Sequence, residues 1–447
     1  MAKAKVGQIT ILLILAALFG GGGSGFGLSN LAVQLAALTI LALNYDAVHN
    51  FLAAAPRAFI ALVIATLALP LLQLVPLPPA IWSALPGRQL VAEAYSFADG
   101  PGWSPFTVNP ARTLVAFISL IAPFTILAIC CSLNEQDRTR VLGLIVGLGL
   151  LNLVPGIVEV LGGDGQSLLY PANKMPGVMF GLFANRNSTG LFLVCCLILL
   201  AALPTIKRSA LGTLSRLLLA TLLTLGVVLT QSRSSIALLI LPAGVAIIRA
   251  ISAHKSSVPQ KLPMTLRAIF AAGLAGVILL SIAPLLGETR LGTIADRFEQ
   301  GDGQRSLIWE DGRFAAERYW PLGAGMGTFD EVFQVDESLE YISPRRAGRA
   351  HNDYLELAIE AGALGMALAF GWALWIIFAA WRALATPQQW PAIAGTGILV
   401  AIALQSLLDF PLRNQTMLCI AAFALLLIIP QRKDTSADAA ANGTLSA

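Results

Sequence analysis

The segment GRAHNDYLEL, residues 348–357, places a histidine directly before a long apolar stretch. An unperturbed histidine titrates at about pH 6.5, so it can accept a proton at neutral pH. Asp353, Tyr354 and Glu356 follow closely enough in sequence to orient or tune the imidazole of His351. The segment therefore favours proton transfer, although a polar residue that merely precedes a helix cap would give the same pattern.

Three further apolar stretches begin with an arginine beside residues that cap helices. Asn, Ser, Asp and Thr satisfy the free N–H groups of a helix N-terminus, and such a terminus favours a bound anion. With Arg186, Arg233 and Arg413, the four helix starts predict an anion site at the membrane surface. The alternatives are that Arg233 snorkels to the lipid headgroups and that Arg413 forms a turn with Asp409. The three stretches are FANRNSTG (183–190), TQSRSS (230–235) and DFPLRNQT (409–416).

Composition defines the kind of chain that must position these side chains. Of its 447 residues, 56% are hydrophobic and 12% are charged, whereas a soluble domain carries about 25% charged residues. This composition predicts a polytopic membrane protein. The formal charge of +4 is too small to indicate a nucleic-acid partner. All five cysteines lie inside apolar runs, so we expect no disulfide, no metal ion and no cofactor.

The apolar runs predict an all-α fold with about twelve transmembrane helices, since each run reaches or approaches the ~20 residues that cross a bilayer. Nine helices are expected within residues 1–286 and three within residues 353–430. Residues 287–352 are expected to form one long periplasmic loop with short amphipathic helices, and residues 431–447 a disordered cytoplasmic tail. For the first run, a cleaved signal peptide is the alternative. The runs lie near residues 8–22, 29–44, 58–76, 113–132, 141–161, 188–206, 217–232, 234–250, 267–286, 353–381, 391–408 and 414–430.

The basic residues indicate an orientation. The predicted inner segments hold fifteen Lys and Arg residues and the short outer segments hold six, in line with the positive-inside rule. Both termini are then cytoplasmic, and residues 287–352 are external. All eight basic residues of this loop are arginines, whose planar fork of donors matches phosphate oxygens. For most of them, the alternative is a solvated loop in which they balance carboxylates.

Two stretches of the long loop carry local signals. RSLIWEDGRFAAERYW, residues 305–320, has apolar residues at helical spacing, which predicts a short amphipathic helix lying on the membrane. PLGAGMGTF, residues 321–329, predicts a turn. Its GxG is too weak to indicate a nucleotide site, because no strand or βαβ unit precedes it.

The chain carries, in this order, FANRNSTG, LTQSRSS, GQRSLIW followed by PLGAGMGTF, AHNDYLELAIEAGALG, and DFPLRN. Over roughly residues 180–430 this series resembles the O-antigen ligase and polysaccharide polymerase superfamily of bacterial inner-membrane glycosyltransferases. The resemblance implies an enzyme that works without a metal at the periplasmic face of the inner membrane. It would take a glycan from undecaprenyl pyrophosphate and attach it to a sugar hydroxyl of an acceptor glycan or glycolipid.

The resemblance also implies roles for individual residues. Carried over by motif, Arg233 and Arg305 hold the pyrophosphate and His351 lies at the acceptor hydroxyl. Arg186 stands where the family often has proline, which puts its role in doubt. Arginines and helix N-termini can meet the charge of a departing pyrophosphate while a histidine takes the proton, and an inverting single displacement is the hypothesis. The expected site consists of His351 as the catalytic residue and of Arg233, Arg305, Arg186, Asn187, Asn352, Tyr354 and Arg413 as substrate-binding residues.

Some alternatives stay open at the level of sequence. The enzyme could transfer finished glycans or polymerise them, and His351 could act as a base or only orient the acceptor. From another class, a transporter or flippase of lipid-linked saccharides would also need many helices and phosphate-binding arginines. Such a protein should place ionisable residues near the bilayer midplane and show internal repeats. Here the ionisable residues cluster at one face, and the sequence has no evident repeat.

Reporter fusions test the predicted orientation. A fusion at Ala210 should report a cytoplasmic location and a fusion at Gln300 a periplasmic one, because basic residues hold the inner segments on the cytoplasmic side. The measurement is the activity of paired alkaline phosphatase and fluorescent protein fusions in intact cells. A cytoplasmic location of Gln300 would contradict the external loop and, with it, the predicted site.

Overall fold

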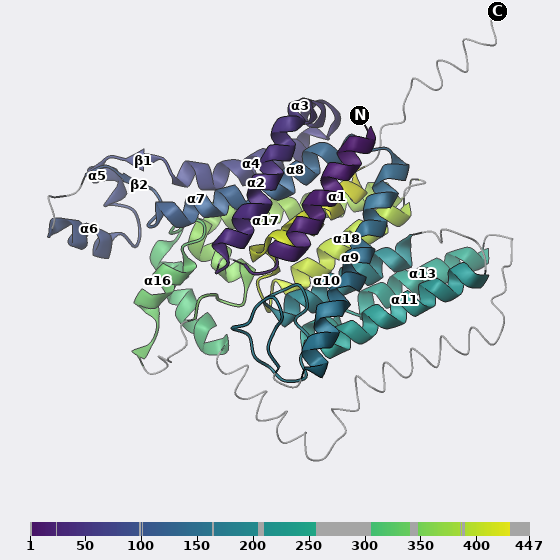
Figure 1. Ribbon diagram of the computed structural model, residues 1–447. Coiled ribbons are helices and arrows are strands. Elements are labelled where there is room, and N and C mark those ends of the chain that lie inside the picture. The colour runs from purple at the N-terminus through teal and green to yellow at the C-terminus, as the bar shows by residue number, and fades with distance from the viewer. Residues whose placement is uncertain are drawn as a thin grey trace, which may run out of the picture.

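The structure is a computed structural model in which most of the described chain is helical. It describes residues 2–23, 25–97, 100, 102–162, 165–203, 210–255, 305–339, 347–384, 386 and 389–429. The helices of these residues form an elongated bundle, and a short antiparallel strand pair, β1 (Pro76–Leu77) with β2 (Ser104–Pro105), lies at one end of it (Figure 1). The all-α prediction is confirmed for this part of the chain.

The helices follow the predicted apolar runs. Residues 267–286, the predicted ninth span, lie outside the described residues, and each of the other runs coincides with one or two helices. Residues 305–319 are also helical. The named helices are α1 (Ala2–Phe19), α2 (Gly27–Leu43), α3 (Tyr45–Ala54), α4 (Arg57–Gln73), α5 (Pro79–Trp82), α6 (Gln89–Ser96), α7 (Pro110–Ser119), α8 (Ile121–Cys130), α9 (Glu135–Leu161), α10 (Arg186–Ala202), α11 (Ala210–Leu229), α12 (Arg233–Ala237), α13 (Ile240–Lys255), α16 (Phe329–Asp336), α17 (Asp353–Leu384), α18 (Gln389–Gln405), the 3₁₀ helix η2 (Pro411–Arg413) and α19 (Gln415–Ile428).

Length and composition decide which helices can cross a membrane. Among the described residues five helices qualify, and the bent pair α2 and α3, with a 79° bend, would be a sixth. Five shorter apolar helices of 10–17 residues accompany them. These helices support a polytopic α-helical membrane protein, while the number of twelve spans stays a prediction. The five long helices are Pro110–Cys130, Glu135–Leu161, Ala210–Leu229, Arg233–Ser252 and Asp353–Leu384.

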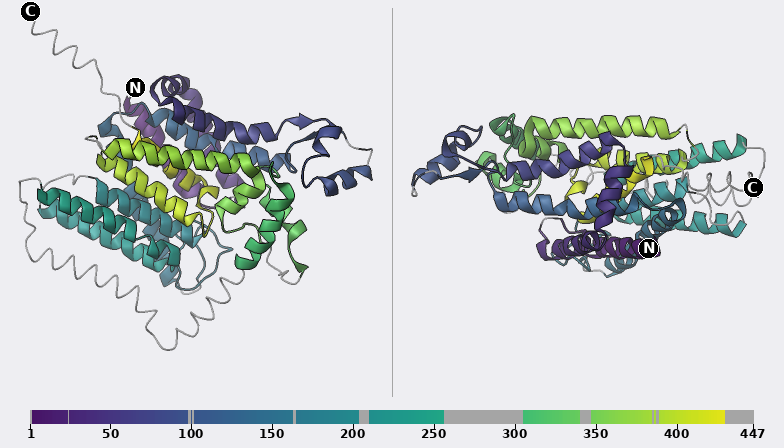
Figure 2. Two further views of the ribbon diagram at one scale, coloured as in Figure 1. Left: turned by 180° about the vertical axis from the view of Figure 1, so that it is seen from behind. Right: turned by 90° about the horizontal axis from the view of Figure 1, so that it is seen from above.

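α10 is the central helix of the bundle. Its residues from Ser188 to Leu199 are all buried, and it packs against α9, α11, α13 and α18. A helix that is surrounded by other helices is apolar on every side. This burial explains why FANRNSTG is followed by a run of Leu, Val, Ile and Cys. The long helix α17, in contrast, lies along one outer side of the bundle (Figure 2).

The predicted amphipathic helix over 305–320 is present at 305–319. Ile308, Ala315 and Tyr319 on its apolar face pack in a cluster with Phe329 and Ala350. This face therefore packs against other parts of the protein. The prediction that it lies on the membrane surface is wrong. The helix consequently lies against the segment that leads to His351.

PLGAGMGTF forms a turn, as predicted, and packs against α17. Gly323, Gly325 and Gly327 have φ values of 86°, 120° and 84°, which glycine adopts more readily than other residues. The N–H of Gly325 donates to the carbonyl oxygen of Glu360 at 2.8 Å. A Cβ atom on Gly325 would lie 1.9 Å from Oγ1 of Thr107. Close backbone packing therefore explains these glycines, and no nucleotide is needed to account for them.

Substitution of Gly325 tests this packing. Gly325→Ala should lower the free energy of unfolding by about 1–3 kcal/mol, because the new methyl group meets Thr107 and the backbone there has a positive φ. Thermal unfolding of the detergent-solubilised protein measures the effect. Gly348→Ala is the matched control, since an added Cβ there has no neighbour within 4 Å. Equal unfolding midpoints for the two variants would contradict a packed loop.

Candidate functional site

The four predicted helix starts lie at one end of the bundle, and each has the expected cap. In every case a side-chain oxygen of Asn or Ser accepts a hydrogen bond from an N–H group in the first turn of the helix. The prediction of capped N-termini is thus confirmed. The bonds are Asn187 N to Asn185 Oδ1 (2.9 Å), Ser235 N to Ser232 Oγ (3.3 Å), Tyr354 N and Leu355 N to Asn352 Oδ1 (3.0 and 3.1 Å), and Met417 N to Asn414 Oδ1 (2.9 Å).

The start of α10 touches the starts of α12 and α19. Ser235 Oγ donates to the carbonyl oxygen of Asn187 at 3.2 Å, which joins α12 to α10. Asn414 Nδ2 donates to Ser188 Oγ at 3.4 Å, which joins α19 to α10. The polar residues of FANRNSTG, TQSRSS and DFPLRN therefore form one cluster, although they are far apart in the sequence.

His351 pairs with Asp409, which sequence reasoning did not predict. Nδ1 of His351 lies 3.2 Å from Oδ1 of Asp409, and Asn185 Nδ2 donates to Oδ2 of Asp409 at 2.8 Å. The Asp409 side chain is 1% exposed and the His351 side chain 35% exposed. Because a carboxylate only accepts, Nδ1 carries the proton, and the lone pair of the neutral ring is on Nε2.

The residues predicted to orient His351 are engaged elsewhere. Asp353 and Glu356 contact arginines, and the Tyr354 hydroxyl donates to the carbonyl oxygen of Ala403 at 3.1 Å. His351 itself has a φ of +50°, a left-handed conformation that costs a β-carbon residue roughly 1–2 kcal/mol. This turn places the imidazole beside the 409–410 segment, where its ring lies 5.0 Å from that of Phe410.

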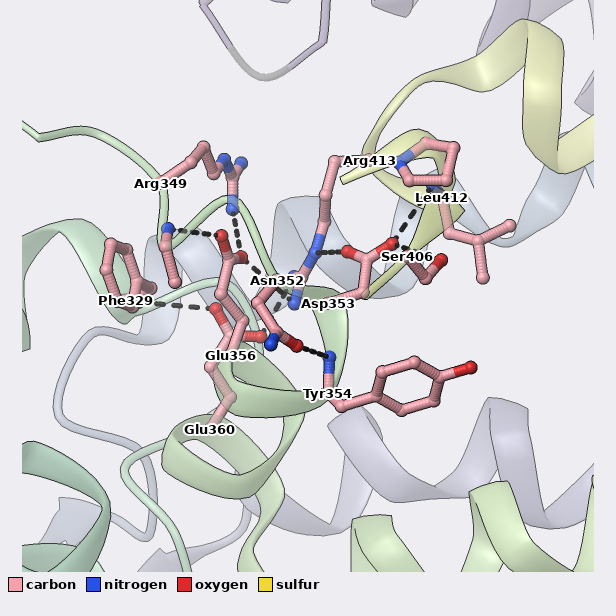
Figure 3. Close-up of polar contacts among 12 residues, drawn as sticks. Phe329, Arg349, Asn352, Asp353, Tyr354, Glu356, Glu360, Ser406, Leu412 and Arg413 are labelled. Carbon is pink, nitrogen blue, oxygen red and sulfur yellow. Dashed lines mark hydrogen bonds and ion pairs between the residues drawn. The ribbon is translucent and has the colours of Figure 1, made fainter. Parts of the chain in front are cut away.

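Arg413 lies among three carboxylates of α17 (Figure 3). Its Nε is 3.3 Å from Asp353 Oδ1, its Nη2 is 3.1 Å from Glu356 Oε2, and its Nη1 is 2.9 Å from Glu360 Oε2. Burial lowers the pKa of the Arg413 guanidinium, but the three carboxylates, Glu360 first, raise it above its usual value. Arg413 thus pairs with α17 and not in a turn with Asp409, which was the alternative suggested by sequence.

The same carboxylates fix the chain on both sides of His351. Glu356 is fully buried and accepts from the N–H of Ala350 at 2.9 Å and from Arg349 Nη1 at 3.0 Å. Glu360 accepts from the N–H of Phe329 at 3.2 Å, which joins α17 to α16. Figure 3 shows the Glu356 carboxylate in contact with both Arg349 and Arg413. The buried Glu356 carboxylate therefore stabilises the turn that contains His351.

Arg233 and Arg186 are each the first residue of a capped helix. α11 ends at Leu229 and α12 begins at Arg233, so the two helices are almost continuous, as predicted. The break is made by Gln231, whose φ is +51° and whose Nε2 donates to the carbonyl oxygen of Gly177 at 2.9 Å. Arg233 is exposed and Arg186 is half-buried. Both therefore carry positive charge at the N-terminal ends of α12 and α10.

Arg305 opens the helix over 305–319 and is half-buried. One turn later, Trp309 Nε1 donates to the carbonyl oxygen of Ala350 at 2.8 Å. The residue next to His351 is thus tied to the helix that begins at Arg305.

A buried carboxylate of α9 shapes the loop beside Arg233. Glu159 is 3% exposed and accepts from Ser167 Oγ and from the N–H groups of Leu168, Phe180 and Gly181 at 2.7–2.9 Å. Glu159 is not among the residues predicted above from the sequence. An acidic side chain inside an apolar run was the available signal, because such residues are costly unless they are paired.

Within the described ranges, no group of three or more His, Cys, Asp or Glu side chains is arranged to hold a metal ion. Fold and site together define a helical membrane protein with a histidine–carboxylate pair at the common end of four capped helices. Residues 217–370 match the family model of the O-Antigen ligase. This match contains Arg233, Arg305, His351, Asn352 and Tyr354 and confirms the resemblance to the O-antigen ligase and polysaccharide polymerase superfamily. A comparison with curated proteins gives no match.

Removal of Arg413 tests the buried ion cluster. Arg413→Met should lower the free energy of unfolding at neutral pH by about 3–5 kcal/mol, because three buried carboxylates lose their cation. Thermal unfolding of the detergent-solubilised protein measures the effect.

The control for Arg413→Met is Arg140→Gln. Arg140, whose side chain is 53% exposed, pairs with Asp137, and ion pairs with a solvent-exposed partner contribute about 0–1 kcal/mol. A destabilisation of Arg413→Met that is as small as this would show that the cluster does not stabilise the site.

Proposed function

We propose that the chain is a membrane glycosyltransferase that moves a glycan from undecaprenyl pyrophosphate onto an acceptor sugar hydroxyl at the periplasmic face. The observation that carries the proposal is the position of His351, paired with Asp409 through Nδ1, at the end where four capped helices begin. The O-Antigen ligase match over 217–370 supports the class of enzyme. The identity of the donor, the identity of the acceptor and the periplasmic location of the reaction are proposed in addition to this class.

The donor would lie at the N-termini of α10 and α12. Cleavage of the bond between the anomeric carbon and the pyrophosphate oxygen leaves negative charge on the pyrophosphate. Arg233 is the first candidate to meet that charge, since it is exposed at a capped helix start, and Arg186 and Asn187 are next to it across the Ser235 contact. Arg305 would approach from the long loop.

The acceptor would lie at Nε2 of His351. As the hydroxyl oxygen bonds to the anomeric carbon, its proton passes to Nε2, and Asp409 stabilises the resulting imidazolium. Asn185 holds Asp409 in place through the 2.8 Å hydrogen bond. Asn352 and Tyr354 lie on the same turn and are proposed to contact the acceptor sugar. A single displacement of this kind inverts the anomeric carbon and uses no metal.

Arg413 is proposed to act indirectly. Its three carboxylate contacts already balance its charge, so it offers little attraction to a pyrophosphate. Its role in this proposal is to fix α17 against the segment that carries Asp409.

The proposed orientation places the site end of the bundle in the periplasm and both termini in the cytoplasm. Two contacts indicate that the site and the two chain termini lie at opposite ends of the bundle. The N–H of Gln415, at the start of α19, donates to the carbonyl oxygen of Gly20, just after the end of α1. Arg138, near the start of α9, donates to the carbonyl oxygen of Leu426 at the end of α19. The proposed domains keep the predicted boundaries, 1–286, 287–352, 353–430 and 431–447.

Purified protein with a lipid-linked oligosaccharide tests this function. Wild-type protein should lengthen the lipid-linked chain or move it to a glycolipid acceptor, as seen by gel and mass spectrometry. Arg233→Ala should abolish the product, and Arg233→Lys should restore only part of it because the planar fork is lost. His351→Asn should lower turnover by about 10² to 10⁴, the usual contribution of positioned proton transfer, with little change in donor binding.

His351→Asn is chosen because asparagine tolerates a positive φ and can still donate to a carboxylate. Arg140→Gln, at the opposite end of the bundle, should keep wild-type turnover. Chain growth would identify a polymerase, and transfer to a glycolipid core a ligase. No product with wild-type protein, or full activity in Arg233→Ala, would overturn the proposal, and the former would favour a transporter of lipid-linked saccharides.

A further inference from the structure

The end of the bundle opposite His351 has a second pair of arginines. Arg216 of α11 donates to the carbonyl oxygen of Leu203, and Arg249 of α13 donates to that of Ala202. Both carbonyl groups belong to the C-terminal end of α10. The two guanidinium groups therefore converge on neighbouring peptide units, although they come from different helices.

An indole completes this group. The Cζ atom of Arg249 lies 4.6 Å from the ring centroid of Trp390, the second residue of α18. Arg216, Arg249 and Trp390 are all half-buried. Four helices, α10, α11, α13 and α18, thus contribute to one small polar region at the far end of the bundle (Figures 1 and 2).

The charge of this region is not balanced within the described part of the chain. A helix C-terminus carries roughly half a negative charge, while two guanidinium groups bring two full positive charges. Neither Arg216 nor Arg249 pairs with a carboxylate among the described residues, where their partners are carbonyl oxygens and the indole. Positive charge at the edge of a low-dielectric region is costly unless an anion meets it.

Exposed apolar side chains occur within two positions of each arginine in the sequence. Leu214 and Leu218 of α11 and Ile248 and Ile251 of α13 are exposed large apolar side chains on helices long enough to cross a membrane. A partly buried cationic group with an indole beside it, on helices that expose apolar side chains, matches a phospholipid headgroup with its acyl chains.

We propose that Arg216, Arg249 and Trp390 bind the phosphate diester of an anionic membrane lipid. Each guanidinium has five N–H donors, so it can keep its carbonyl partner on α10 and still donate to phosphate oxygens. The lipid would tie the ends of α10, α11, α13 and α18 together. In the orientation proposed above this is the cytoplasmic leaflet, but the site itself does not depend on the proposed enzyme activity.

Nanodiscs of defined composition test the lipid site on the full-length protein. One set contains phosphatidylcholine alone, and the other contains phosphatidylcholine with phosphatidylglycerol or cardiolipin. Native mass spectrometry counts the lipids that stay bound to the protein after its release from the discs. Thermal unfolding of the protein is measured separately in the intact discs. Wild-type protein should retain anionic lipid in preference to phosphatidylcholine and should unfold at a higher temperature in the anionic discs.

Arg216→Gln with Arg249→Gln should reduce the retention of anionic lipid by about fivefold for each arginine. The double variant Arg216→Lys with Arg249→Lys keeps both charges but loses the planar forks of donors. Its retention of anionic lipid should therefore lie between that of the wild type and that of the glutamine pair. Arg140→Gln is the control, because Arg140 is exposed near the start of α9, where Asp137 already balances its charge at 2.6 Å. Its lipid retention should equal that of the wild type.

Soluble glycerol phosphate, added to phosphatidylcholine discs, separates a lipid from a free phosphate. It should give no rise in the unfolding temperature. Stabilisation by glycerol phosphate would mean that the site binds phosphate without the lipid. Equal retention of both lipid classes by wild type, or unchanged retention in the glutamine pair, would mean that the arginines only cap α10. If the glutamine pair does not fold, the test rests on the lysine pair and on the comparison of the two lipid classes with wild-type protein.

Discussion

The arrangement of the site depends on the buried ion cluster around Arg413. Asp353, Glu356 and Glu360 are spaced i, i+3 and i+7, so they share one face of the first two turns of α17. Charges buried in this way stabilise a structure only when they are paired and hydrogen-bonded, and Arg413 contacts all three carboxylates. The start of α17 is thereby fixed against the start of α19. His351 lies just before α17, and Asp409 lies just before η2, the 3₁₀ helix that carries Arg413. The contact between His351 and Asp409 therefore depends on the cluster.

The conformation of His351 follows from the same constraint. A positive φ at a residue with a β-carbon persists only where the surroundings determine it. Glu356 fixes Ala350 on one side of His351, and Asn352 caps α17 on the other. The imidazole is therefore held before any substrate binds, with Nδ1 engaged and Nε2 available. General-base catalysis requires preorganisation of this kind, because the group that gives up its proton must meet a correctly oriented lone pair.

Local features of the site could be predicted from sequence, and long-range partners could not. The caps, the near-continuity at Arg233, the helix over 305–319 and the glycine turn all follow from residues within a few positions of one another. The pairing of His351 with Asp409 joins residues 58 positions apart, and periodicity does not indicate which helix start lies opposite which. Sequence proximity therefore favoured Asp353 and Glu356 as partners of His351. Glu159 and Glu360 could have been found only as acidic side chains within apolar runs.

The two ends of α10 have complementary electrostatic requirements. Its N-terminus, like those of α12, α17 and α19, directs partial positive charge toward the site. The axial dipole of the same helix places partial negative charge at Ala202 and Leu203, where Arg249 and Arg216 are found. The two arginines thus offset the partial negative charge at the C-terminal end of a helix that is buried along most of its length. The polarity that favours an anion beside Asn187 at one end thus creates a need for cations at the other, and a single central helix links the two polar regions of an otherwise apolar protein.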